Sequence, residues 1–361
     1  MIERIGLVVH GGKEAAVAAA ARVKAWARGR GVPCAEIDVW NTPAADGDEK
    51  DGGMGRLTAL EEAEQAGLPD LVVTVGGDGT LLRGVRVAAA VDALVLGIDV
   101  GRVGFLTEVR VPDLEAALDA VHAGTGHVDA RLMLTMRASR PLEIPTGMQA
   151  LLRYGRGPLL PPPTPRDADP GHTGWGVPLD VLGLNDVVFE KLARDRQASV
   201  AIYVSGRLLG FYSADAFVVA SSTGSTAYSF AAGGPIVSPH LDALVFTPVA
   251  PHMVFDRSLV LSAREERVAV RVLERSGRVA VSVDGRLCGV LDPGDWVSVY
   301  AAPRRARLAR LADPDFLGRV RDRFGLADAP AALADGSAPA EYRPAQPLPD
   351  DLAHPGPPDI H

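Results

Sequence analysis

The sequence predicts an α/β plus β fold with two domains, and three observations support this prediction. Up to about residue 110, short apolar runs alternate with helix-like segments. From about residue 130, apolar residues recur at every second position, which is typical of strands with one buried face. The length of 361 residues is enough for one large or two medium domains.

Strands and helices are expected to alternate in the first part of the chain. The strands are short apolar runs, and the helices are rich in good helix formers. In order, we expect the strand Ile5 to Val9, the helix Lys13 to Arg28, the strand Ala35 to Val39, the helix Leu57 to Ala66, the strand Leu71 to Val75, the helix Leu81 to Ala90, the strand Ala93 to Ile98 and a helix over 111–123. Such alternation predicts a parallel sheet with right-handed crossovers. We therefore expect a Rossmann-like domain of residues 1–110, completed by about 300–328.

The second part is predicted to be mostly antiparallel. Its alternating apolar positions are Leu132, Leu134, Met136 and Ala138, then Val268, Val270 and Val272, then Val279, Val281 and Val283. Ser276-Gly277 and Asp284-Gly285 are hairpin turn signals, and Pro293-Gly294-Asp295 is a further turn before the strand Trp296 to Tyr300. We expect a β-sandwich-like domain over residues 125–298.

Three segments do not fit either pattern. Residues 41–56 are acidic and rich in glycine, which predicts a surface loop. Residues 141–179 are rich in proline and glycine and are interpreted as a partly disordered insertion. The tail over 330–361 is predicted to be disordered, while the helix Asp315 to Phe324 before it is expected to pack.

Composition narrows the classes of protein. The net charge of −8 and a pI of about 5.5 argue against nucleic acid and against anionic membranes as main partners. The two cysteines, Cys34 and Cys288, suggest neither a disulfide framework nor a zinc motif. The N-terminus lacks the apolar core of a signal peptide, and the most apolar region, Val85 to Val100, contains charges and is too short to span a bilayer. We expect a soluble cytoplasmic protein.

The segment Gly76-Gly77-Asp78-Gly79-Thr80 is the strongest functional signal. It follows a predicted strand and precedes a predicted helix, and three of its five residues are glycines. Such a turn brings backbone N–H groups against a phosphate, and the Asp78 carboxylate can accept a proton from a nearby hydroxyl or position that hydroxyl. Glycine-rich turns without a ligand are also common, so both interpretations stay open at this stage.

A second signal is the hydroxyl-rich segment Ser221 to Ser229. Five of the six residues from Ser221 to Thr226 carry hydroxyls, which can bind one polar ligand while Tyr228 offers a face for stacking. The alternative is a capped turn that leads into a helix. Asn185-Asp186 lies within an apolar stretch and Asp215 lies just before one; each is a ligand-binding candidate or else a surface or turn-capping residue.

Together these segments resemble the NAD kinase family. The matching pieces are Gly76 to Thr80, Gly97 to Leu106, Leu184 to Val188, Thr223 to Tyr228, Ala232 to Pro235 and Pro248 to His252, in the order that the family has. The resemblance covers about residues 3–325, apart from 141–179. The glycine turn alone is shared with lipid kinases and phosphofructokinases, whereas the combination is specific.

The resemblance implies a role for each matching residue. Asp78 would act on the 2′-hydroxyl of the adenosine ribose of NAD, with Gly79 beside it, and Arg83 would contact phosphate. Asn185 and Asp186 would bind the nicotinamide-side ribose or the facing adenine part, and Asp215 would lie near the nicotinamide. The adenine and ribose pocket would be lined by Thr226, Ala227, Tyr228, Ser229 and Ala231.

The implied reaction is phosphoryl transfer from ATP or polyphosphate to NAD, which yields NADP, with Mg²⁺ on the donor phosphates. The family also implies a homodimer or homotetramer. Four positions depart from the usual pattern: Asp99, Asp186, Ala216 and the pair Ser221-Ser222. Of these, Asp99 adds a negative charge near a phosphate site. The alternatives are a lipid or diacylglycerol-type kinase and a non-catalytic dinucleotide-binding regulator.

Overall fold

The computed structural model describes residues 1–39, 58–101, 104–145, 162–166, 176–193, 195–253, 255–311 and 315–326. It divides into two units, residues 1–314 and 315–361, which are described separately. The acidic segment 41–56 and the tail 330–361 lie outside the described residues, as does most of the proline-rich segment 141–179. In the second unit, α7 (Phe316–Phe324) begins with the Asp315 carboxylate accepting the Gly318 N–H at 2.7 Å.

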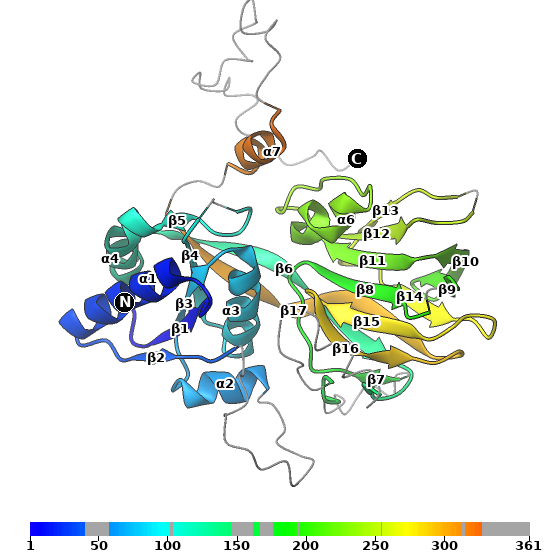
Figure 1. Ribbon diagram of the computed structural model, residues 1–361, viewed down its shortest axis with the longest axis horizontal. Coiled ribbons are helices and arrows are strands. Elements are labelled where there is room, and N and C mark those ends of the chain that lie inside the picture. Colours follow the sequence, from blue (N-terminus) through cyan, green and yellow to red (C-terminus); the bar gives the residue numbers. More distant parts are fainter. Residues whose placement is uncertain are drawn as a thin grey trace, which may run out of the picture. The chain divides into compact units, whose positions relative to one another are not determined.

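The first part of the chain has the predicted alternation of strands and helices (Figure 1). Its elements are β1 (Ile5–Val9), α1 (Glu14–Gly29), β2 (Cys34–Glu36), α2 (Ala59–Gln65), β3 (Leu71–Gly76), α3 (Asp78–Ala90), β4 (Leu94–Asp99), β5 (Val109–Arg110), η1 (Val111–Asp113) and α4 (Leu114–Ala123). The strands β4, β3, β1 and β2 are neighbours and run parallel. This confirms the N-terminal α/β domain.

Helices cover both faces of this parallel sheet. Side chains of α1 and α4 pack with Leu7, Val73 and other residues of one face. Side chains of α2 and α3 pack with Val8 and Val72 on the other face. Because successive strand residues point to opposite faces, both faces are apolar and these strands read as continuous hydrophobic runs.

The second part consists of two facing sheets. The larger sheet continues from the α/β domain through β17 (Trp296–Arg310), β14 (Val268–Val272), β9 (Ala198–Val204) and β10 (Arg207–Ala214). Strand β6 (His127–Ala138) lies beside β17, and β7 (Val177–Pro178) lies beside β6. The smaller sheet has the order β13 (Leu259–Ser262), β12 (Ala243–Val249), β11 (Ala216–Ser221), β8 (Asp186–Lys191), β15 (Val279–Val283) and β16 (Arg286–Leu291). All its pairings are antiparallel, as predicted.

One core fills the space between the two sheets. The rings of Phe217 and Phe246 stack with centroids 6.2 Å apart, and Tyr212 meets both edge-on. The cluster draws residues from strands of both sheets. The alternating pattern of the sequence therefore reflects inner faces of a sandwich.

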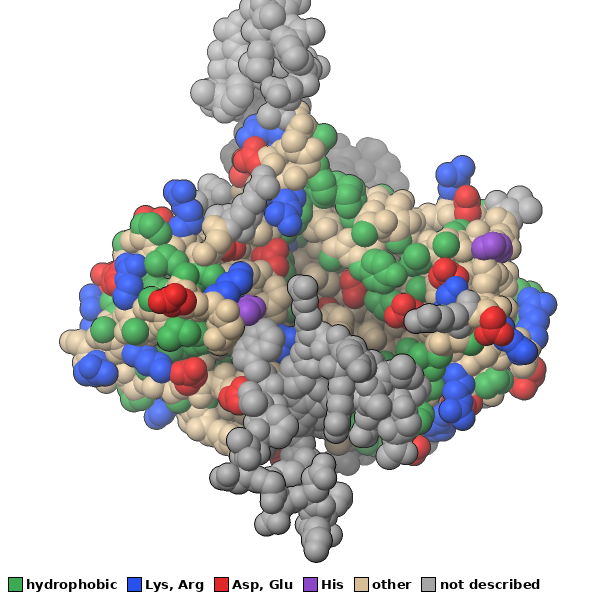
Figure 2. Space-filling view, viewed as in Figure 1, with side chains coloured by type: hydrophobic (Ala, Val, Ile, Leu, Met, Phe, Trp, Pro, Cys, Tyr) green, Lys and Arg blue, Asp and Glu red, His purple; other side chains and the backbone are tan. Residues whose placement is uncertain are grey.

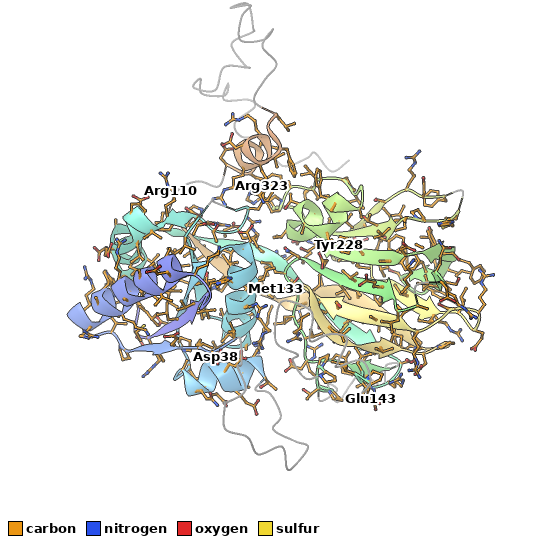
Figure 3. All side chains as sticks on the ribbon, viewed as in Figure 1. Asp38, Arg110, Met133, Glu143, Tyr228 and Arg323 are labelled. Carbon is orange, nitrogen blue, oxygen red and sulfur yellow. The ribbon has the colours of Figure 1, made fainter. Side chains whose placement is uncertain are left out.

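The strands β17 and β6 belong to both parts of the molecule. The start of β17 pairs with β14, whereas Arg307 and Leu308 near its end pair in parallel with β4. Strand β6 pairs with β17 along most of its length, and Met133 marks it in Figure 3. A continuous pair of strands thus fixes β4, through its amino end, relative to the antiparallel sheets.

Two details differ from the sequence predictions. Ser276-Gly277 does not form a hairpin, because β14 belongs to the larger sheet and β15 to the smaller one, so the segment crosses between sheets. Asn185-Asp186 does not lie inside a strand, since β8 begins at Asp186. The Asp284-Gly285 turn does form a hairpin, with φ of 48° and 73° as a type I′ turn requires.

The described surface shows no strong segregation of charge on the face in Figure 2, where basic and acidic side chains are interspersed. Among the described residues, no helix is long and apolar enough to cross a membrane.

Candidate active site

The glycine turn lies where β3 ends and α3 begins. Gly77 precedes the helix and Asp78 is its first residue. A Cβ on Gly76 would lie 2.2 Å from the Thr80 hydroxyl oxygen, so this position requires glycine. Around Gly77 and Gly79 a Cβ would meet nothing within 4 Å, which leaves space beside the helix N-terminus. Thr80 is buried, and no described residue hydrogen-bonds to its hydroxyl.

The Asp78 carboxylate is held by the loop that follows β4. Its Oδ2 accepts the Phe105 N–H at 2.9 Å, and its Oδ1 accepts the N–H groups of Leu106 and Thr107 at 3.1 Å each. A Cβ on Gly104 would lie 2.2 Å from this carboxylate, so only glycine permits the approach. The sequence motif identified Gly104, but the roles of the three following amides were not predicted.

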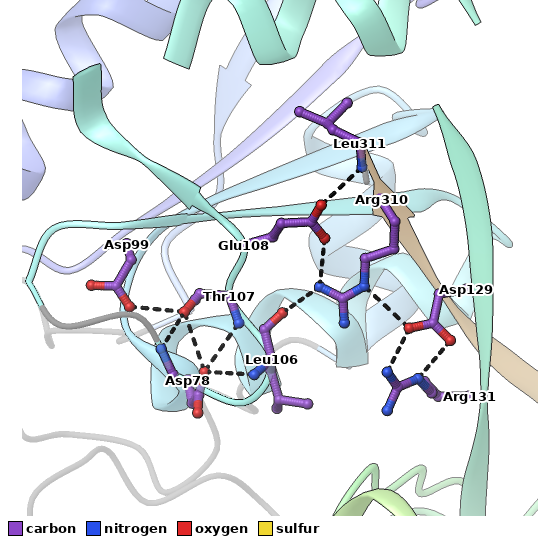
Figure 4. Close-up of polar contacts among 10 residues, drawn as sticks. Asp78, Asp99, Leu106, Thr107, Glu108, Asp129, Arg131, Arg310 and Leu311 are labelled. Carbon is purple, nitrogen blue, oxygen red and sulfur yellow. Dashed lines mark hydrogen bonds and ion pairs between the residues drawn. The ribbon is translucent and has the colours of Figure 1, made fainter. Parts of the chain in front are cut away.

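A second carboxylate, Asp99, shares a partner with Asp78 (Figure 4). The Thr107 hydroxyl lies 2.8 Å from Asp99 Oδ2 and 3.5 Å from Asp78 Oδ1. Because this hydroxyl has one proton, it donates to the nearer Asp99. Asp99 also accepts the Gly101 N–H at 2.6 Å and is buried. Hydrogen bonds thus replace the water that this buried carboxylate has lost.

A buried guanidinium network extends from this loop (Figure 4). Arg310 donates to the Leu106 carbonyl at 2.9 Å, to Glu108 at 3.0 Å and to Asp129 at 3.1 Å. Arg131 donates to Asp129 at 2.5 and 2.6 Å. Burial raises the pKa of Asp129, but the hydrogen bonds and charges of Arg131 and Arg310 outweigh this effect and hold the pKa below its usual range.

The same network reaches the hydroxyl-rich segment. Arg131 Nη1 lies 3.4 Å from the Thr223 hydroxyl, at the start of η2 (Thr223–Thr226). The path from Asp78 to Thr223 runs through the loop 105–107 and two arginines. The structure therefore connects the two motifs that the sequence singled out. Neither arginine was predicted. Arg310 pairs with Asp129, which lies 181 positions earlier in the chain, and local sequence patterns do not reveal such a pairing.

Most hydroxyls of the segment 221–229 form hydrogen bonds to backbone carbonyls or to another hydroxyl of the protein. Ser221 donates to the Leu184 carbonyl at 2.5 Å, Ser225 to the Ser222 carbonyl at 2.7 Å, and Thr226 to the Thr223 carbonyl at 3.3 Å. Ser222 donates to the Leu241 carbonyl, and the buried Ser229 pairs with the Thr247 hydroxyl at 2.9 Å. The serine and threonine turn of the alternative interpretation is present, because the Gly224 N–H donates to the Ser221 hydroxyl at 3.1 Å. The N-cap residues of η2 and α6, Ser222 and Ala227, make no side-chain cap hydrogen bond. The exposed residues Tyr228 and Ala231 lie on α6 (Tyr228–Ala231) (Figure 3).

Asn185 and Asp186 are positioned by a carboxylate across the smaller sheet. Asp284 accepts the N–H groups of Leu184 and Asn185 at 2.7 Å each and that of Asp186 at 3.1 Å. A Cβ on Gly224 would lie 2.0 Å from the Asn185 carbonyl oxygen, so η2 packs directly against this turn. Asp284 was recognised in the sequence only as a turn residue.

Asp186 differs from its neighbours because no described residue donates a hydrogen bond to its carboxylate. It is 5% exposed. Burial and the charge of Asp284 raise the pKa of Asp186 to about 7. The nearby Tyr228 has a raised pKa through burial and the negative charges of Glu190, Asp186 and Asp215. This side of the site is therefore rich in carboxylates.

Two predicted residues lie at the edges of this arrangement. Asp215 joins β10 to β11, and its carboxylate pairs with Lys191 at 2.5 Å. Arg83 lies on α3 five residues after Asp78, about 140° around the helix. Burial, together with the charge of Arg86, lowers the pKa of Arg83. The role of Arg83 in phosphate binding stays a prediction.

A glycine turn with a carboxylate at the carboxyl end of a parallel strand is typical of nucleotide-binding α/β proteins. Comparison with known families is specific. The ATP-NAD kinase N-terminal domain matches residues 5–126, and the ATP-NAD kinase C-terminal domain matches residues 184–311. The chain belongs to the NAD kinase family, which decides against the lipid kinase alternative.

Individual relatives agree with this assignment. NAD kinase 1 of Streptomyces coelicolor is 60% identical over 353 residues, which cover 98% of this chain and 94% of that protein. NAD kinase 1 of Streptomyces avermitilis is 58% identical over 362 residues, covering 99% of this chain and 98% of that protein. Among solved structures, yeast NADH kinase in complex with NADH has a TM-score of 0.67 and 20% sequence identity. The match covers 91% of this chain and 89% of that chain. The structural likeness shows the fold.

Proposed function

We propose that this member of the NAD kinase family makes NADP at the carboxylate of Asp78, by transfer of a phosphoryl group from ATP to the 2′-hydroxyl of the adenosine ribose of NAD. One observation carries the assignment to Asp78. A carboxylate has about four acceptor sites, two on each oxygen. Oδ1 accepts two backbone N–H groups and Oδ2 accepts one. One site on Oδ2 remains, which suits a single hydroxyl group.

Asp78 accordingly orients the ribose hydroxyl and accepts its proton as phosphorus approaches. The fixed loop holds the carboxylate in place, so little reorganisation is needed when substrate binds. Gly77 and Gly79 leave the space in which a ribose and its phosphates can approach the backbone. The transition state of phosphoryl transfer is loose, so positioning and charge stabilisation dominate over covalent chemistry.

The phosphate groups are proposed to lie at the N-terminus of α3, a helix of 13 residues whose first N–H groups have no acceptor within the helix. Gly76, Gly77 and Gly79 bring the backbone to the phosphates, with Thr80 and Arg83 on the next turn. Mg²⁺ would be held here largely by the oxygens of the donor phosphates and by water, because the ion usually keeps several waters and binds through substrate phosphates. The ion would neutralise charge on the donor phosphates. The described residues contain no cluster of three or more metal-ligating side chains.

The remainder of NAD is proposed to bind along the smaller sheet. Asn185 and Asp186 present polar groups at the start of β8, and Asp215 lies at the β10–β11 junction. We propose that the pocket for the adenine and ribose of NAD is lined by Thr226, Ala227, Tyr228, Ser229 and Ala231. Support comes from the packing of η2 on Asn185 and from the arginine network that ties both motifs together. Ser229 contributes through its fixed backbone, since its hydroxyl is paired with Thr247.

Three further assignments complete the proposal. Polyphosphate is an alternative donor to ATP. A homodimer or homotetramer is the proposed assembly, and the exposed apolar side chains Leu208, Leu209 and Phe211 on the edge strand β10 support association. The cytoplasm is the proposed location, because Cys34 and Cys288 are free thiols.

The decisive experiment measures NADP formation from NAD, ATP and Mg²⁺ by the wild type and by Asp78→Asn. The substitution removes the acceptor of the ribose proton, and we expect kcat to fall by roughly 10²–10⁴-fold. NAD affinity, measured by calorimetry, should change only a few-fold. Asp113→Asn, an exposed aspartate at the start of α4, is the matched control and should keep full turnover. Turnover of Asp78→Asn at the wild-type rate would remove Asp78 from this role, and a wild type that forms no NADP would leave the regulator alternative.

A further inference from the structure

A cavity rich in arginine lies at the other end of α3. Its volume is about 530 Å³, and its charged lining residues are Glu61, Arg86, Arg166, Asp180, Arg286 and Arg304. Four positive groups therefore face two negative ones in a protein whose net charge is −8. The rest of the lining is largely apolar, from side chains such as Leu60, Pro163 and Val181.

Two of the four guanidinium groups already have protein partners. Arg86 forms a buried ion pair with Glu62 of α2. Arg304 donates to the carbonyls of Ala89 and Ala90 at 3.1 and 2.7 Å and so completes the C-terminus of α3. These two arginines stabilise the walls of the cavity.

The other two guanidinium groups form no ion pair within 4.0 Å in the described part of the chain, although the pKa of Asp284, which burial raises, is lowered in part by the charge of Arg286. The Nε of Arg166 is buried without a hydrogen-bond acceptor, and its Nη2 reaches only the Thr135 hydroxyl at 3.5 Å. Arg286 has a sulfur contact, 4.0 Å to Cys288. Burial lowers the pKa of Arg86, Glu62 raises it, and the charge of Arg286 lowers it again. Like charges are thus close together in the cavity.

We propose that this cavity binds a small organic anion with at least two negative charges, of the phosphate-ester or polycarboxylate class. Guanidinium groups pair with such oxyanions through two parallel hydrogen bonds, and Arg166 and Arg286 provide unused donors. The volume is that of a metabolite site, and the apolar wall suits a carbon skeleton beside the charged group. The ligand supplies the hydrogen-bonded oxyanion that neither guanidinium group has in the described part of the chain.

This site is separate from the site of phosphoryl transfer. Arg86 lies eight residues after Asp78 on the same helix, a distance of roughly 12 Å along its axis. Asp78 lies at the carboxyl ends of the parallel strands, whereas Ala90 and Arg304 lie towards their opposite ends. The inference therefore does not depend on the assignment of Asp78.

Calorimetry with citrate and with pyrophosphate tests the proposal. The full chain is first saturated with NADP, so that the proposed NAD site is occupied. We expect one anion per chain to bind, with affinity at least roughly tenfold weaker in Arg166→Gln and in Arg286→Gln. The matched control is Arg271→Gln, an exposed arginine of β14 outside the cavity, which should bind like the wild type. Equal binding by the double variant Arg166→Gln/Arg286→Gln, or no binding of either probe to the wild type, would overturn the proposal.

Chemical protection provides a second measurement that needs no variant. Phenylglyoxal modifies accessible guanidinium groups, and mass spectrometry identifies the modified residues. Citrate should slow the modification of Arg286 at least fivefold and leave that of Arg271 unchanged. Equal slowing at both residues, or at neither, would contradict a site in this cavity.

Discussion

The two halves of the candidate active site use the same device, an aspartate that gathers three consecutive backbone N–H groups. In the α/β domain Asp78 holds residues 105–107, and in the antiparallel part Asp284 holds residues 184–186. The neighbouring carboxylates differ. Asp99 accepts an N–H and a hydroxyl, whereas Asp186 accepts no hydrogen bond from a described residue. The first carboxylate pair is engaged by donors of the protein, and the second region retains an acid to which no described residue donates a hydrogen bond.

This difference indicates how each region meets a ligand. A carboxylate that has lost water without gaining donors holds its proton more strongly. Asp186 therefore exchanges a proton near neutral pH, where a ribose hydroxyl can become its missing partner. The comparison predicts large structural effects at Asp284, pH-dependent effects at Asp186 and small effects at Asp99.

The largest effect is expected for Asp284→Ala. The substitution leaves three backbone N–H groups without their acceptor and puts alanine at a φ of 48°. We expect the free energy of unfolding to fall by about 3 kcal/mol, together with weaker NAD binding. Asp284→Asn keeps one acceptor oxygen and tolerates the positive φ, so its loss should be about half as large. Urea denaturation measures both, and an alanine variant within 1 kcal/mol of the wild type would contradict the parallel between the two aspartates.

Asp284 also shows how far the sequence alone could lead. Its place in an Asp-Gly hairpin turn was predictable from local chemistry, and so was the glycine turn around Asp78. Its hydrogen bonds, however, reach residues such as Leu184, which lies 100 positions earlier in the chain. Local sequence patterns contain no information about such contacts. Arg310 is similar, because its buried position depends on the pairing of β17 with β6 and β4.

The main error of sequence interpretation concerned Ser276-Gly277. A short polar turn between two alternating apolar runs looks the same whether the runs pair or face each other. Here β14 and β15 lie in opposite sheets, so the turn crosses the sandwich. The hydroxyls of 221–229 were ambiguous for a related reason. Their use depends on which backbone carbonyls lie nearby, such as those of Leu184 and Val237.

The second prediction concerns pH and Asp186. The unfolded chain releases this proton near pH 4, but the folded protein keeps it up to about pH 7. The stability that Asp186 contributes is therefore complete at low pH and is lost as the pH rises through 7. Between pH 5 and 8 the wild type should lose roughly 2–3 kcal/mol relative to Asp186→Asn, whose amide does not titrate.

Urea denaturation of both proteins at pH 5, 6, 7 and 8 measures this difference. Asp113→Asn serves as the control, since its difference from the wild type should not vary with pH. A constant offset between Asp186→Asn and the wild type would mean that Asp186 is ionised throughout this range, and the contrast between the two regions would then disappear.

The smallest effect is expected for Asp99→Asn. The amide keeps its oxygen on the Gly101 N–H, while its NH₂ group donates to the Thr107 hydroxyl, whose proton then turns to Asp78, 3.5 Å away. Hydrogen bonding is thus conserved while one negative charge leaves the neighbourhood of the proposed phosphate site. At a separation of roughly 8 Å and an effective dielectric constant of about 40, that charge costs a bound phosphate group about 1 kcal/mol. The KM for ATP should therefore fall about fivefold, with kcat changed less than threefold and stability within about 1 kcal/mol of the wild type.

Steady-state kinetics of Asp99→Asn, with Asp113→Asn as the control, measures this change in KM. An unchanged KM would place the donor phosphates beyond the reach of Asp99, and a collapse of kcat would show that Asp99, like Asp78, cannot be replaced by its amide.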